Sequence, residues 1–102
     1  MVSQLLQKIS LRFKRWRLLR QIERKYRNEV EQICDLFRKA VDEAFDKYMP
    51  SDLSKEIPRG KEQMQRLEQE INYQRGICEQ RILTVRNKYQ AKYHEIMART
   101  SL

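Results

Sequence analysis

The sequence predicts an all-α protein in which two long helices fold back on each other as an antiparallel hairpin. Charged residues make up 35% of the chain and it holds two glycines and two prolines, too few turn residues for a many-stranded sheet. Apolar side chains recur at helical spacing along two stretches, with a break between Met49 and Pro58. We therefore expect a single domain over residues 1–102, with helices over about 4–49 and 58–99 and a loop over about 50–57.

The first predicted helix, residues 4–49, carries an apolar seam with steps of four, four and three residues. These steps form an 11-residue repeat of about 3.67 residues per turn, which favours straight or slightly right-handed pairing in the manner of a coiled coil. Arg15 fills the one polar position. The seam consists of Leu11, Arg15, Leu19, Ile22, Tyr26, Val30, Ile33, Phe37, Val41, Ala44 and Tyr48.

The break between the helices is marked by two prolines. Pro50 cannot continue a helix, and Pro58 suits the first turn of the next one. A short loop between two seams of equal period is typical of an antiparallel helical hairpin.

The second predicted helix, residues 58–99, repeats the same steps. Gly76 lies inside this helix, where glycine costs about 1 kcal/mol relative to alanine, and it marks a kink, a close helix contact or a neutral defect. The second seam consists of Leu67, Ile71, Gln74, Cys78, Ile82, Val85, Tyr89, Tyr93 and Ile96.

Apolar residues off both seams predict a second covered surface. Surplus apolar side chains on a small protein mark interfaces, so we expect a homodimer, forming a four-helix bundle, or a complex with a partner helix. These off-seam residues include Leu36, Phe45, Tyr73, Ile77 and Leu83.

Positive charge is concentrated toward the ends of the chain. The net charge is +8, and the basic N-terminal segment, residues 1–27, holds nine Lys or Arg against one acidic residue. Residues 28–58 hold four against eight, and residues 59–102 hold nine against five. In a hairpin this distribution predicts a positive open end and a negative loop end.

A binding site for an anionic partner is predicted at this open end. Four basic residues of the second helix are spaced by 7, 4 and 7 positions, which places them within about 40° around the helix axis. Basic residues of the first helix, interleaved with aromatic ones, complete the site. The predicted residues are Arg12, Arg15, Trp16, Arg17, Arg20, Arg81, Lys88, Lys92 and Arg99.

Several partners fit a basic surface of this kind. An acidic protein surface, on a partner or a second copy, is favoured because charges on bundles commonly set pairing. Nucleic acid fits through phosphate contacts and stacking on Trp16. An interfacial membrane helix would use apolar residues such as Leu5, Ile9 and Trp16, but Leu11 and Leu18 lie opposite that arc. A mitochondrial-type presequence fits the acid-free start, although serines are few and the helical pattern continues.

Catalytic, cofactor and metal sites are not expected. The one histidine, His94, has Ala91 three residues earlier, so the Glu-x-x-His motif of di-iron bundles is not formed. Phosphate loops, nucleophile elbows and zinc-type Cys/His clusters do not occur in the sequence. Cys34 and Cys78 have no CxxC spacing and are predicted to be small buried hydrophobic residues in a reducing compartment.

The functional prediction is a non-enzymatic helical-hairpin protein that acts through helix–helix protein contacts, as an adaptor, chaperone or assembly component. The alternative is a nucleic-acid-binding protein that uses its basic open end. No stretch reaches the roughly 20 apolar residues of a membrane span, and we expect a cytoplasmic location without a signal peptide, cofactor or small-molecule substrate.

Overall fold

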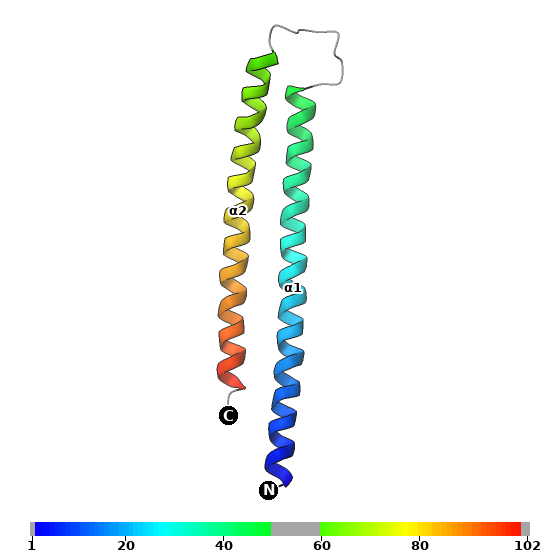
Figure 1. Ribbon diagram of the computed structural model, residues 1–102, viewed down its shortest axis with the longest axis vertical. Helices are drawn as coiled ribbons and strands as arrows, with labels where there is room; N and C mark the ends of the chain where they lie inside the picture. The colour runs from blue at the N-terminus through cyan, green and yellow to red at the C-terminus, as the bar shows by residue number, and fades with distance from the viewer. Residues whose placement is uncertain (1, 50–59, 101–102) are drawn as a thin grey trace. The chain divides into compact units, whose positions relative to one another are not determined.

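The computed structural model describes residues 2–49 and 60–100, and nearly all of them are helical. Helix α1 spans Val2–Tyr48 and helix α2 spans Gly60–Arg99, with 47 and 40 residues (Figure 1). No strand occurs within these two ranges. The prediction of an all-α fold with two long helices is therefore confirmed, while the predicted loop and both prolines lie outside the described residues.

The chain forms two compact units, each of which contains part of α1 and part of α2. Unit 1 comprises residues 1–30 and 83–102, and unit 2 comprises residues 31–82.

Unit 1 pairs its two helical segments in antiparallel fashion. Arg15 contacts Thr100, Tyr26 contacts Tyr89, and Glu29 contacts Lys88 and Tyr89. The α2 partner thus falls in number as the α1 residue rises. This register confirms the antiparallel pairing that the two seams predicted.

The predicted seam of α1 is confirmed at every position, because all eleven residues are buried or half-buried. In α2 the prediction holds except at Tyr93, which is 44% exposed. Lys92 is half-buried instead, with its Nζ 5.3 Å from the centre of the Tyr89 ring. The long alkyl stem of a lysine covers apolar surface while its ammonium group stays near water, so a lysine can occupy a seam position.

The core is small, as expected for a pair of helices. Among the described residues, the buried apolar ones are Ala44, Leu67, Tyr89 and Ile96. In unit 2, Cys34 and Cys78 are half-buried free thiols. Burial, and secondly the neighbouring Cys34, raises the pKa of the Cys78 thiol. Most seam residues remain only half-buried, so the helix pair leaves much apolar surface uncovered.

Candidate binding surfaces

The positive charge of the chain belongs to unit 1. This unit holds thirteen Lys or Arg residues against three Asp or Glu, whereas unit 2 holds nine against eleven. Unit 1 is therefore strongly positive and unit 2 is close to neutral.

Tyr89 is the centre of the polar contacts in unit 1. Its hydroxyl donates a hydrogen bond of 3.1 Å to Oε1 of Glu29, and the Nζ of Lys88 lies 3.5 Å from the same oxygen. The Tyr26 ring meets the Tyr89 ring edge to face, with 5.7 Å between centres. Burial, followed by the hydrogen bond to Glu29, raises the pKa of Tyr89.

The four basic residues predicted on α2 are partly engaged within the protein. Lys88 and Lys92 both place their ammonium groups over the Tyr89 ring, at 5.4 and 5.3 Å. Arg99 is exposed and lies 3.5 Å from Glu95. Arg81 is exposed and belongs to unit 2. The structure thus brings Lys88 and Lys92 together at one buried ring.

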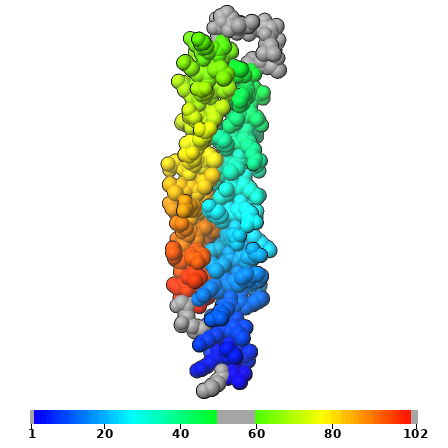
Figure 2. Space-filling model, viewed as in Figure 1, coloured from blue at the N-terminus to red at the C-terminus, as the bar shows by residue number. Residues whose placement is uncertain are grey.

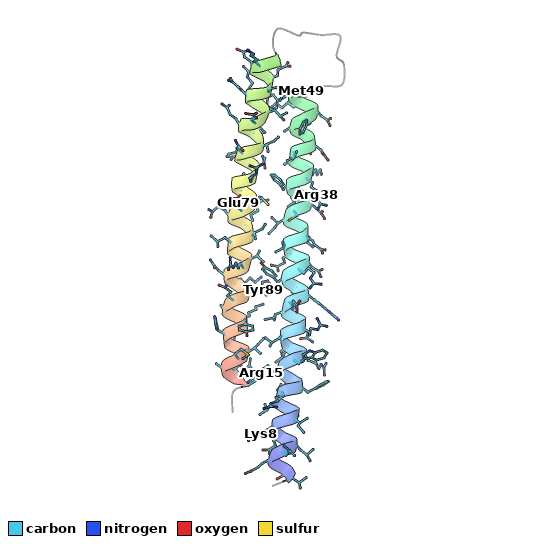
Figure 3. All side chains as sticks on the ribbon, viewed as in Figure 1. Lys8, Arg15, Arg38, Met49, Glu79 and Tyr89 are labelled. Carbon is cyan, nitrogen blue, oxygen red and sulfur yellow. The ribbon has the colours of Figure 1, made fainter. Side chains whose placement is uncertain are left out.

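Arg15 closes the C-terminal end of α2. Figure 3 labels Arg15 beside the C-terminal end of the α2 ribbon. The Nε of Arg15 donates to Oγ1 of Thr100 at 2.8 Å, and its Nη2 donates to the Thr100 carbonyl oxygen at 2.6 Å. The Thr100 hydroxyl in turn donates to the carbonyl oxygen of Ile96. An arginine at this position satisfies a carbonyl group near the helix end and interacts favourably with the negative end of the helix dipole.

Thr100 is a contact residue that the sequence prediction missed. It follows Ile96 by four residues, which continues the step pattern of the seam, and it is buried. Extending the repeat by one step would have found it.

The other predicted residues of α1 are exposed and surround an apolar stripe. Arg12, Arg17 and Arg20 are exposed, and the guanidinium of Arg20 lies 5.6 Å from the centre of the Trp16 ring and 3.9 Å from Glu23. We call the exposed large apolar residues of this segment the N-terminal stripe. It consists of Val2, Leu5, Leu6, Ile9, Phe13 and Trp16, which are 55–73% exposed.

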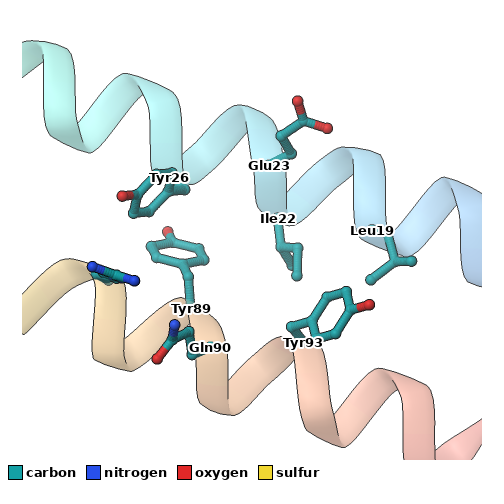
Figure 4. Close-up of a pocket in the computed structure, with 8 residues that line it drawn as sticks. Leu19, Ile22, Glu23, Tyr26, Tyr89, Gln90 and Tyr93 are labelled. Carbon is teal, nitrogen blue, oxygen red and sulfur yellow. The ribbon is translucent and has the colours of Figure 1, made fainter.

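A shallow apolar groove of about 450 Å³ lies along unit 1, between α1 and α2. Leu19 and Ile22 come from α1, and Tyr93 faces them from α2 (Figure 4). The groove can accept apolar groups, with polar side chains at its border. Its lining is Leu19, Ile22, Glu23, Tyr26, Arg86, Tyr89, Gln90 and Tyr93.

Unit 2 carries a second exposed apolar surface, centred on Gly76. A hollow of about 510 Å³ lies along α2, and a Cβ atom built on Gly76 would meet nothing within 4 Å. A narrow hollow beside it, between the helices, includes Leu36 and Ile77, and both hollows are lined by Ile77 and by the predicted anion-binding residue Arg81. We call this surface the Gly76 face, defined by Leu36, Tyr73, Gly76 and Ile77.

Comparisons with protein-family models, with curated proteins and with solved structures found no match. Within the described ranges, no helix is long and apolar enough to cross a membrane.

Proposed function

We propose that this chain is a non-enzymatic assembly protein that works through helix–helix contacts, and that two copies pack through the Gly76 face into a four-helix bundle. The observation that carries the proposal is the open notch at Gly76, flanked by Tyr73 with 65% exposure. Leu36, with 53% exposure, continues the apolar surface onto α1.

The spacing of this face suits a packed helix. Tyr73, Gly76 and Ile77 are separated by three and four residues, so they lie on one side of α2. Side chains of one helix insert between those of its neighbour when two helices pack. The absent side chain of Gly76 leaves a hole between Tyr73 and Ile77 that a side chain of a second helix would fill.

A second copy suits this face because the charge of unit 2 is nearly balanced. Two copies of unit 1, with thirteen basic and three acidic residues each, would repel one another, whereas unit 2 has nine against eleven. A two-fold contact would also bury Tyr73 and Leu36 of both copies at once.

Sedimentation equilibrium over a concentration series tests this proposal. We expect the wild type to dimerise and Gly76→Gln to weaken the dimer at least tenfold, because the longer side chain fills the notch. Glutamine favours helix over glycine by somewhat less than 1 kcal/mol, so Gly76→Gln should fold at least as stably as the wild type.

Glu68→Gln, at an exposed position of α2 outside the Gly76 face, is the matched control and should dimerise like the wild type. A wild type that stays monomeric at every concentration, or a Gly76→Gln dimer of unchanged affinity, would contradict the proposal.

A further inference from the structure

We propose that the N-terminal stripe binds an anionic lipid bilayer, with this part of α1 lying parallel to the membrane surface. This activity is separate from assembly through the Gly76 face and does not depend on it.

The first argument is geometric. At 100° per residue, the stripe residues fall within an arc of about 100°, centred about 140° from the seam that faces α2. Leu11 and Leu18, which lie opposite the stripe, are half-buried. Arg15 is held by Thr100. In the sequence, Leu11, Leu18 and Arg15 interrupt the amphipathic pattern of this segment. In the folded protein the two leucines are half-buried and Arg15 is hydrogen-bonded to Thr100, so none of the three prevents the stripe from facing a membrane.

The second argument is that the stripe has no cover within the described chain. Every residue from 2 to 10 is exposed, and Thr100, the last described residue of the α2 segment, contacts α1 at Arg15. Figure 2 shows the N-terminal part of α1, in blue, continuing past the C-terminal end of α2, in red. A single unpaired helical stretch of this length is marginal in water, so a surface that buries its apolar side is expected to stabilise it.

The third argument is charge. Residues 1–22 contain six Lys or Arg and no acidic residue. Lys8 and Arg12 follow one edge of the stripe and Arg17 follows the other. A hollow of about 240 Å³, lined by Lys8, Leu11, Arg12, Arg15 and Thr100, lies on the side of α1 that faces the α2 segment and not beside the stripe. The basic side chains nearest the stripe, Arg12 on one edge and Arg17 on the other, are therefore the ones placed to meet anionic headgroups.

These features together favour a lipid surface over other anionic partners. An interfacial helix places its apolar residues among the acyl chains and its basic residues at the headgroups, with aromatic rings at the boundary, as Phe13 and Trp16 would be. Nucleic acid would contact the basic edges and leave the apolar centre in water. A helix segment whose charges are all positive suits a uniformly negative plane.

The single tryptophan of the chain provides a direct test. The full-length protein is titrated with vesicles of phosphatidylcholine alone and of phosphatidylcholine mixed with phosphatidylserine. We expect a blue shift of Trp16 fluorescence and co-flotation with the mixed vesicles, and at least tenfold weaker binding to the neutral ones.

Substitutions separate the apolar and electrostatic parts. Leu5→Gln with Ile9→Gln should weaken binding to mixed vesicles more than tenfold, because two exposed apolar side chains are removed. Lys8→Gln with Arg12→Gln should also weaken it about tenfold or more. Leu83→Gln, a similar change at a residue with 47% exposure on α2, should bind like the wild type.

Three outcomes would overturn the proposal. They are the absence of a blue shift with mixed vesicles, an unchanged affinity of the Leu5→Gln, Ile9→Gln variant, and binding to a single-stranded oligonucleotide without binding to vesicles. The last outcome would assign the basic surface to nucleic acid. The Gly76→Gln variant should still bind vesicles, so failure of dimerisation and failure of lipid binding are distinguishable.

Discussion

Arg15 illustrates what a periodic pattern reveals about a single residue. The pattern placed it in the seam, and its half-buried position confirms that placement. The same residue was also predicted to bind an anionic partner, but its Nε and Nη2 donate to Thr100. Spacing determines which side of a helix a residue occupies, whereas its partner depends on the register between two helices, which one sequence does not specify.

Tyr89 gives a prediction at the same scale, about stability at high pH. Its pKa is raised in the folded protein, by burial first and by Glu29 second. Below about pH 10, the ordinary pKa of tyrosine, the hydroxyl is protonated in both folded and unfolded chains. Above that pH the unfolded chain ionises first, so this stabilisation is lost as the pH rises through the raised pKa.

We therefore expect the free energy of unfolding, measured with urea, to fall more steeply above about pH 10 in the wild type than in Tyr89→Phe. Tyr93→Phe, at an exposed tyrosine outside the Gly76 face, should follow the wild type. Parallel pH profiles for the wild type and Tyr89→Phe would contradict this role of Tyr89.

At the scale of the helices, the 11-residue repeat predicted most of the fold. Every residue predicted for the α1 seam is buried or half-buried. Apolar side chains with this period form one stripe along the helix, and only a neighbour that runs along the same stripe can bury them. The prediction was wrong at Tyr93, where Lys92 is covered instead. A hydrophobicity pattern treats lysine as polar and therefore misses a buried alkyl stem.

The seam should carry the stability of the hairpin. Leu67 is buried, with 3% exposure, whereas Leu83 is 47% exposed. We expect Leu67→Ala to lower the free energy of unfolding by about 2–5 kcal/mol. Leu83→Ala should change it by about 0.5 kcal/mol or less. Urea denaturation at a low protein concentration measures both changes in the free energy of unfolding. Equal changes for Leu67→Ala and Leu83→Ala would show that the helices pair through another stripe.

At the scale of the whole molecule, composition predicted a charge imbalance, and the structure assigns it to unit 1. The two apolar surfaces were only partly predictable. Leu36, Tyr73 and Ile77 were predicted to lie off the seams. The open space beside Gly76 was not predictable, because a sequence does not show whether the space beside a glycine is filled. The N-terminal stripe was obscured in the sequence by Leu11 and Leu18 on the opposite side of the helix, and both are half-buried in the fold.

Helix pairing leaves two apolar surfaces exposed, and we propose that each of them binds a partner. The Gly76 face belongs to unit 2, whose net charge is nearly balanced, and suits a second copy. The N-terminal stripe, with basic residues on both edges, suits an anionic bilayer.

The measurement that tests the central claim most directly is disulfide cross-linking between copies at the Gly76 face. Tyr73→Cys is made with both native cysteines, Cys34 and Cys78, replaced by alanine, and the oxidised protein is run on a non-reducing gel. Two-fold packing through this face predicts a covalent dimer for Tyr73→Cys and little for Glu68→Cys, at another exposed position of the same helix. Cross-linking of equal extent at the two positions, or none at Tyr73→Cys, would contradict it.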